Sequence, residues 1–224
     1  FEIHAITNGI HPFTWASPFM MALFDKYLPS WANEPELLVR VDNIPDQEVW
    51  EAHAGAKAYL LQYITEVTGE EFDPDILTIV FALRATAYKR ANMVFEDTKR
   101  LMKIGNGKLQ LVFAGKAHPH DDHGKRMIQE IRNQKEIFGD KLKIVYLPNY
   151  NMDVASLLIP GVDIWLNNPL RPLEASGTSG MKAALNGVPN FSVLDGWWIE
   201  GHIEGVTGWS IGPPPTEIST DVNH

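Results

Sequence analysis

Short apolar runs alternate with longer amphipathic stretches from residue 75 onward. Runs rich in β-branched and aromatic residues predict strands, which lie at 77–83, 109–114, 142–147, 162–166 and 190–194. The first three begin about thirty residues apart, as strand–helix–strand units do. Because the runs are apolar almost throughout, we expect an α/β fold: a Rossmann-like, buried parallel sheet with helices on both faces.

The amphipathic stretches predict helices at 88–103, 121–138 and 178–185. Ahead of residue 75 the pattern is mostly helical, with helices expected at 17–27 and 45–68 and a short strand at 3–7. Trp50 is among the apolar positions at helical spacing in the longer helix. Pro45 suits its first turn, and Gly69 suits the position just past its end.

Charged residues, Gly and Pro cluster at 70–75, where we place a boundary. Residues 1–74 are expected to be a mostly helical segment that links to a neighbouring N-terminal domain outside this chain. Residues 75–212 are expected to be the Rossmann-like domain, and residues 213–224 a tail. The chain opens inside what looks like structured sequence and closes without a final element, so we expect both ends to be cuts.

Composition narrows the classes of function. The chain has 224 residues, 45% of them hydrophobic, which is ample for a buried core. A net charge of −9 disfavours binding to a nucleic-acid backbone. The absence of cysteine excludes disulfides, Cys-ligated zinc and a thiol nucleophile, and it fits a reducing compartment. With no signal-peptide pattern and no apolar run of about 18 residues, we expect a cytoplasmic protein without a membrane span.

Basic and small residues follow the predicted strands, at the edge of the sheet where ligands of such folds bind. Arg84, Lys89 and Arg90 follow the first strand, Lys116 the second, Tyr150 the third, and the stretch 174–182 the fourth. Several cations beside open backbone amides suit an anion, phosphate above all.

The stretch after the fourth strand is the most informative. Ser176-Gly177-Thr178-Ser179-Gly180 leads into a helix, so its amides would face an anion with the help of the helix dipole. Lys182 lies near the start of that helix, where nearby cations and burial would lower its pKa, as an amine that forms a Schiff base requires. Spacing alone leaves open an ordinary helix start with a solvated lysine.

Glu174-Ala-Ser-Gly-Thr-Ser-Gly-Met-Lys182-Ala-Ala-Leu-Asn-Gly187 closely resembles the signature of the α-glucan (glycogen, starch, maltodextrin) phosphorylases. Other segments that look like this family are Tyr88-Lys89-Arg90, Gly115-Lys116-Ala117, Leu147-Pro148-Asn149-Tyr150 and Val193-Leu194-Asp195-Gly196. With Asn8-Gly9-Ile10-His11 and Trp197-Trp198, the set is most similar to the shorter bacterial and archaeal branch. The resemblance runs from residue 4 to residue 212.

The resemblance implies two Rossmann-like domains facing a cleft, the GT-B arrangement, of which this chain is the C-terminal half. It implies transfer of a glucosyl unit from the non-reducing end of an α-1,4-glucan to orthophosphate, giving glucose 1-phosphate with retained configuration. It also implies pyridoxal 5'-phosphate on the lysine that matches Lys182. In this family the phosphate of the cofactor is thought to exchange protons with the substrate phosphate.

The same resemblance assigns expected roles to individual residues. The amides of Thr178 and Ser179 match the cradle of the cofactor phosphate, and Tyr150 matches an aromatic neighbour of the cofactor. Arg84 and Lys89 match the cations that hold the two phosphates together, which makes them catalytic candidates beside Lys182. The matches for contacts to the glucosyl hydroxyls are Glu174, Ser176 and Gly177. Leu83 departs from the pattern, because the family usually has a basic residue there, which removes one phosphate contact.

Two other functions remain open at this point. One is a nucleotide-sugar glycosyltransferase of the same architecture, and the other is a catalytically silent sugar- or phosphate-binding module. Because this chain supplies one wall of the expected cleft, we expect it to be inactive alone. The uncovered face of the cleft favours self-association into a homo-oligomer.

Four weaker signals each have a structural alternative. His118, His120 and His123 beside two aspartates invite zinc, but Asp121 or Asp122 can instead cap a helix, and we expect no metal. Trp197 and Trp198 can stack on sugars, although buried core is the stronger interpretation. Arg90 is expected to be a structural partner of the adjacent helix. His11 is open between the glucan cleft and a structural role.

Overall fold

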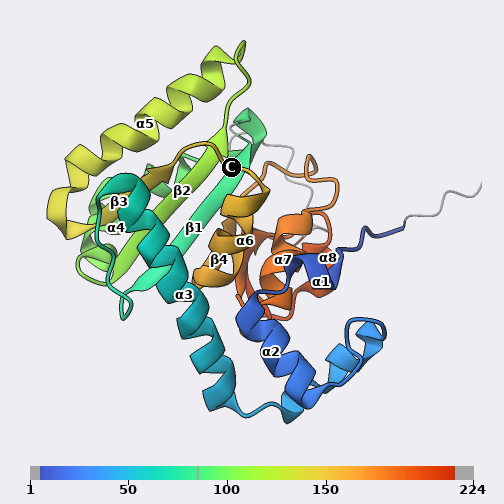
Figure 1. Cartoon of the computed structure of the whole chain (residues 1–224). Helices are drawn as coiled ribbons and strands as arrows, with labels where there is room; N and C mark the ends of the chain where they lie inside the picture. The colour runs from blue at the N-terminus through green and yellow to red at the C-terminus, as the bar shows by residue number, and fades with distance from the viewer. Residues whose placement is uncertain (1–5, 85, 215–224) are drawn as a thin grey trace, which may run out of the picture.

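The computed structural model describes residues 6–84 and 86–214, with Leu83 and Arg84 described by their backbone (Figure 1). Its centre is a six-stranded sheet in the order β3-β2-β1-β4-β5-β6, and every pairing is parallel. The strands are β1 (Leu77–Arg84), β2 (Leu109–Lys116), β3 (Lys143–Leu147), β4 (Ile164–Asn167), β5 (Asn190–Val193) and β6 (Gly208–Ile211). The prediction of a Rossmann-like parallel sheet is confirmed.

Successive side chains of the central strands enter two different cores. In β1, Val80 and Ala82 belong to one cluster of buried residues, whereas Phe81 between them belongs to another. In β2, Val112 and Phe113 divide in the same way. Both faces of the sheet are therefore covered, which explains why the strands read as continuous apolar runs.

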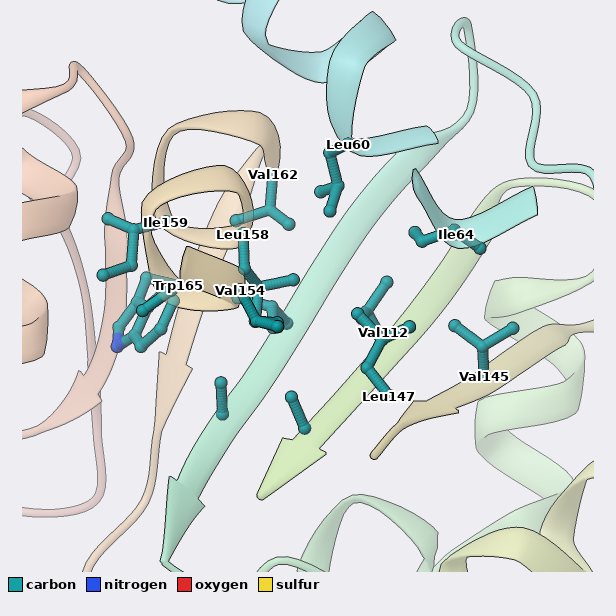
Figure 2. Close-up of a cluster of buried hydrophobic side chains, with 14 of the residues drawn as sticks. Leu60, Ile64, Val112, Val145, Leu147, Val154, Leu158, Ile159, Val162 and Trp165 are labelled. Carbon is teal, nitrogen blue, oxygen red and sulfur yellow. The ribbon is translucent and has the colours of Figure 1, made fainter. Parts of the chain in front are cut away.

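Two helices, α3 (Asp46–Thr68) and α6 (Met152–Gly161), cover one face of the sheet. Figure 2 shows Leu60 and Ile64 of α3 over the strands, with Ile64 on the side of Val112 and Val145 and Leu158 of α6 on the side of Trp165. On the other face, α4 (Thr98–Gly105) and α5 (Asp122–Phe138) pack through residues such as Leu101 and Ile131. The short turn η4 (Gly139–Lys141) leads from α5 to β3.

A third cluster of buried residues lies in the N-terminal segment. It joins α2 (Pro18–Tyr27) to the first turns of α3, with Trp31 fully buried at its centre. The short helix α1 (Pro12–Trp15) precedes α2, and η1 (Pro35–Asn43) connects α2 to α3. Ser17 caps α2 by accepting the Met20 N–H at 3.2 Å.

A buried ion cluster fastens α3 to the amino ends of β1 and β4. The Asp163 carboxylate accepts hydrogen bonds from Lys57 Nζ at 2.7 Å and from the Thr78 N–H at 2.7 Å. It also contacts His53 Nε2 at 2.8 Å. Burial raises the pKa of Asp163, but these contacts outweigh that effect and hold the pKa below its ordinary value. The helical segment is thus joined to the sheet, and the boundary at 70–75 stays a prediction.

Most predicted elements are confirmed, including α2, α3, α5, α7 (Thr178–Leu185) and five strands. The single helix expected at 88–103 is wrong: the chain instead forms η2 (Ala87–Lys89), η3 (Met93–Phe95) and then α4. Arg90 is the reason, because it adopts a left-handed conformation (φ 49°) that ends the first turn.

Sequence analysis missed α6, β6 and the short helix α8 (Trp198–Gly201). Trp50 was expected among the inward positions of α3, but 63% of its surface is exposed. Of the strand expected at 3–7, residues 1–5 lie outside the described residues, and Ile6 and Thr7 are not in a strand. Within the described ranges, no helix has both the length and the apolar character needed to cross a bilayer.

Candidate functional site

Most residues predicted to bind ligands lie where β1 and β4 run side by side. The sheet order reverses between these neighbours, so the connections that follow them leave in opposite directions. In open α/β folds the ligand-binding crevice lies at such a point, beyond the carboxyl ends of the strands. Several hydrogen bonds join the two connections. The Leu170 N–H donates to the Tyr88 carbonyl at 2.6 Å, and Arg90 donates to the carbonyls of Asn168 and Pro169 at 3.0 and 3.1 Å. The Asn168 side-chain amide donates to the Arg90 carbonyl at 3.0 Å.

Lys89 and Glu174 form a buried ion pair across this crevice. The amine of Lys89 donates to Oε2 of Glu174, and the side chains are 8% and 9% exposed. Lys89 comes from the connection after β1, whereas Glu174 comes from the connection after β4. A charge buried to this degree requires a partner, so the pair fixes each group in the site.

The start of α7 presents backbone N–H groups that donate to no acceptor in the described part of the chain. Gly177 is the N-cap in a left-handed conformation (φ 84°), and no described side chain caps the helix. Gly180 N–H donates to the Gly177 carbonyl at 3.1 Å, but the amides of Thr178 and Ser179 make no hydrogen bond to the described residues. Open amides at a helix start attract an anion.

Lys182, in the second turn of α7, packs against an aromatic ring. Its amine lies 3.5 Å from the centroid of the Trp15 ring. Burial lowers the pKa of Lys182, and no carboxylate among the described residues raises it. A lysine with a lowered pKa keeps a larger fraction of neutral, nucleophilic amine near neutral pH.

Asn186 links the backbone at Lys182 to the backbone at Trp15. Its side-chain amide donates to the carbonyls of Trp15 at 2.7 Å and Lys182 at 2.8 Å, and its oxygen accepts the Ser17 N–H at 2.7 Å. Asn186 is 1% exposed. One buried side chain therefore joins the N-terminal segment to the lysine helix.

Several buried polar atoms at this crevice lack a partner among the described residues. They are the side-chain oxygens of Thr86, Asn167, Asn168 and Ser176. Buried polar groups in folded proteins are nearly always hydrogen-bonded, so these atoms indicate a place for a polar ligand or water. Asn167 ends β4 and Asn168 follows it, a position at which sequence analysis could have expected site residues.

A family model described as carbohydrate phosphorylase matches residues 2–206. The chain belongs to the carbohydrate phosphorylase family. It is 42% identical to maltodextrin phosphorylase of Thermococcus litoralis, in an alignment that covers 98% of this chain and 28% of that protein. It is 41% identical to glycogen phosphorylase of Aquifex aeolicus, over 94% of this chain and 34% of that protein. The chain thus spans about a third or less of the length of these relatives.

Most of the residues predicted for the site lie at one edge of the sheet. Lys89, Glu174 and the start of α7 lie at the carboxyl ends of β1 and β4, and Ser176 has its hydroxyl buried there. Arg84 is the last residue of β1, in register with Lys116, and its side chain lies outside what the structure describes.

Tyr150 follows β3 and packs against the core cluster that also contains Ala183, the neighbour of Lys182. Burial raises the pKa of its hydroxyl to about 12. Sequence analysis assigned no role to Trp15, which contacts Lys182 from a segment distant in sequence, or to Asn186, which follows the last residue of α7 and donates to the Lys182 carbonyl.

The weaker signals are now placed. Asp121 caps α5 by accepting the Gly124 N–H at 2.9 Å, as the capping interpretation expects. In the described part of the chain, no group of three or more His, Asp or Glu side chains is arranged to hold a metal. Trp198 is 1% exposed, which confirms its place in the core. Arg90 is structural, although it holds the connection after β4 rather than a helix.

His11 contacts the Thr14 hydroxyl at 2.6 Å and is exposed, which leaves its role open.

A groove of about 870 Å³ lies between α5, the end of α3 and the edge strand β3. The described residues that line it include none of those predicted for chemistry, so this groove is separate from the site at β1 and β4.

Proposed function

We propose that this chain is the pyridoxal-phosphate-binding part of an α-glucan phosphorylase. In the full-length protein it would help to transfer a glucosyl unit from the non-reducing end of an α-1,4-glucan to orthophosphate, giving glucose 1-phosphate with retention. The observation that carries the proposal is the meeting of Lys89, Glu174 and the open start of α7 at the point where the strand order reverses. Membership of the phosphorylase family supports the same reaction class.

The described residues fit the cofactor. Lys182 has an amine whose pKa is lowered by burial, and the Thr178 and Ser179 amides are open one turn earlier in the same helix. The buried Ser176 hydroxyl nearby lacks a partner among the described residues. When bound, pyridoxal 5'-phosphate supplies a phosphate that can serve as an acid–base group beside the substrate phosphate.

The residues of this chain would hold and orient the reactants. Lys182 would anchor the cofactor covalently, and the start of α7 would bind its phosphate through backbone N–H groups and the helix dipole. Lys89 and Arg84 would offset the repulsion between two adjacent phosphates. Glu174, Ser176 and Gly177 would bind the glucosyl hydroxyls, and Tyr150 would pack beside the cofactor.

Covalent mapping tests the cofactor site directly on this chain. We expect incubation with pyridoxal 5'-phosphate and borohydride to add one pyridoxyl group, located on Lys182 by peptide mass spectrometry. Lys182→Arg keeps the positive charge and should abolish the adduct. Lys116 lies exposed at the same edge of the sheet and serves as the internal control. An adduct on Lys116 or Lys89 in preference to Lys182 would show that the site is assigned wrongly.

A turnover assay tests the reaction. A full-length protein that carries this chain should form glucose 1-phosphate from maltodextrin and orthophosphate. Glucosyl transfer from a nucleotide sugar without use of orthophosphate would instead support the glycosyltransferase alternative. We expect the chain alone to be inactive, because chemistry in a GT-B cleft requires both walls to fix the reactants.

A further inference from the structure

The turn that follows β5, residues 195–197, packs on the connection that contains Glu174. Asp195 is 7% exposed, and its carboxylate points back toward the connection after β4. One carboxylate oxygen accepts the Glu174 N–H at 2.9 Å, and the other accepts the Gly196 N–H at 3.0 Å. A carboxylate that accepts backbone N–H groups forms charge-assisted hydrogen bonds, which are stronger than neutral ones.

The rest of the turn contacts the next residues of the same connection. The Trp197 N–H donates to the Ser176 carbonyl at 2.8 Å. Gly196 has φ +56°, and a Cβ added there would lie 2.5 Å from that carbonyl oxygen. A Cβ added at Gly177 would lie 3.2 Å from the Trp197 ring. The 195–197 turn therefore supports positions 174, 176 and 177 in succession.

Glu174 is consequently held at two points. Asp195 fixes its backbone N–H, and Lys89 contacts its carboxylate from the opposite side of the crevice. The side chain can occupy few other positions while both contacts are kept. Groups that bind a reacting substrate gain from such support, because a displacement of about 1 Å can cost about 100-fold in rate.

We propose that Asp195 is a positioning residue for recognition of the glucosyl unit. It acts through the backbone of Glu174. Its hydrogen bond to the Glu174 N–H keeps the Glu174 carboxylate beside Lys89, where it faces the crevice. In this role Asp195 acts on the Glu174 backbone and the Gly196 N–H, and it would not contact cofactor or substrate itself. This inference rests on the proposed function, in which positions 174, 176 and 177 bind glucosyl hydroxyls.

The substitution Asp195→Asn tests this role with little change in volume. The new amide group can accept from only one of the two N–H groups, so the Glu174 backbone loses its support or the turn itself loosens. We expect kcat/KM for glucose 1-phosphate to fall about 10- to 100-fold, the range for one hydrogen bond to a charged group. The content of pyridoxal 5'-phosphate should not change, because Lys182 and the start of α7 are untouched.

A double-mutant cycle separates positioning from a general structural role. Asp195→Asn, Glu174→Gln and the double variant are compared in the full-length, cofactor-loaded protein. If Asp195 acts through Glu174, its substitution should cost less than about 3-fold once Glu174 is already Gln. Losses that multiply in the double variant would overturn the proposal, and so would wild-type kinetics in Asp195→Asn.

Hydrogen exchange gives a readout that does not depend on turnover. The Glu174 amide should exchange faster in Asp195→Asn, whereas the amides of Val80 and Val112 in the central strands should keep their protection. Unchanged exchange at Glu174 would overturn the proposal. Should Asp195→Asn fail to fold, Gly196→Ala is the second variant, because its methyl group displaces the same turn from the Ser176 carbonyl. We expect the same loss of kcat/KM with unchanged cofactor content. Wild-type kinetics in Gly196→Ala would count against the positioning role.

Different results would contradict the proposed function and the positioning role of Asp195. An inactive wild-type protein, loaded with cofactor, would contradict the proposed function, and the exchange rate of the Glu174 amide would still report on Asp195. An active wild type with independent effects of Asp195 and Glu174 would contradict the positioning role alone.

Discussion

The amine of Lys182 lies 3.5 Å from the centre of the Trp15 ring, although the two residues belong to segments far apart in the sequence. The contact has two opposing effects on the amine. The ring helps to bury it, which favours the neutral form, while the electron-rich face attracts the ammonium form by roughly 0.5–2 kcal/mol. Burial lowers the pKa of Lys182, and the aromatic face acts in the opposite direction.

Trp15→Ala should therefore raise the pKa of Lys182 toward its ordinary value, since it opens the amine to water. The measurement is the rate of acetylation of Lys182 at a series of pH values, followed by mass spectrometry of the peptide. Lys116 serves as the internal standard, because it is exposed and because it ends β2, which lies on the other side of β1 from β4. An unaltered Lys182 profile would show that other groups bury the amine.

Trp15→Leu separates the two effects. Leucine keeps much of the apolar cover but lacks the aromatic face, so the ammonium form loses its attraction. We expect a pKa below that of the wild type, the opposite direction to Trp15→Ala. A shift in the same direction for both variants would mean that cover alone controls the amine.

Asn186→Asp should loosen the N-terminal segment without changing the size of the side chain. The aspartate can still accept the Ser17 N–H, but it cannot donate to the carbonyls of Trp15 and Lys182. Buried carbonyls left without a donor cost about 1–3 kcal/mol. Denaturant unfolding measures the loss, and Asn133→Asp on the exposed side of α5 is the matched control. Equal stability of the two variants would contradict the role given to Asn186.

Asp163→Asn should lower the free energy of unfolding by about 3–5 kcal/mol, because it leaves Lys57 and His53 buried without their carboxylate. Asp140→Asn, at an exposed position, is the control. Denaturant unfolding at neutral pH measures both. A loss below 1 kcal/mol for Asp163→Asn would mean that the cluster contributes little to holding α3 on the sheet.

The same cluster predicts part of the acid sensitivity. The folded-state pKa of Asp163 is below its ordinary value, so its contribution is complete above a pH of about 4 and is lost as the pH falls through the folded-state pKa. Below pH 4, we expect the free energy of unfolding to depend less steeply on pH for Asp163→Asn than for the wild type. Parallel curves would assign the acid loss to other carboxylates.

Gly161→Ala should destabilise the protein despite the better helix propensity of alanine. At Gly161 the helix α6 crosses α3 so closely that an added Cβ would lie 2.6 Å from the Leu60 Cβ and 3.0 Å from the Ala56 carbonyl. We expect a loss of about 1–3 kcal/mol from this overpacking. At Gly9 an added Cβ has no neighbour within 4 Å, and Gly9→Ala should be neutral. Thermal unfolding of both variants decides the matter.

The sequence was sufficient for the sheet and for the placement of several candidate site residues, because both depend on local pattern. Continuous apolar runs identified β1 to β5, and the residues just after β1 and β4 include the Lys89–Glu174 pair. The second helix of the chain, α2, was also found, since Ser17 and Pro18 form a recognisable start.

What the sequence did not reveal depends on contacts between distant segments. The contact of Trp15 with Lys182 requires the N-terminal segment to pack on α7, which no local pattern encodes. The turns in place of a helix at 88–97 arise because Arg90 is drawn to the carbonyls of Asn168 and Pro169. The helix α6 escaped notice because its run is apolar on most sides and contains Pro160.

The strand order also bears on how the chain assembles. The strands β1, β2 and β3 pair with near neighbours in sequence, and β4, β5 and β6 do the same, so each set of three forms a unit that is contiguous in the sequence. The two units share a short ladder, in which Ile79 pairs with Ile164 and Val80 with Trp165. Lys89 and Glu174, 85 positions apart, meet only when that ladder has closed. A ligand bound between them stabilises the closed state by mass action, so we expect occupancy of the site to slow separation of the two units more than it slows fraying within either one.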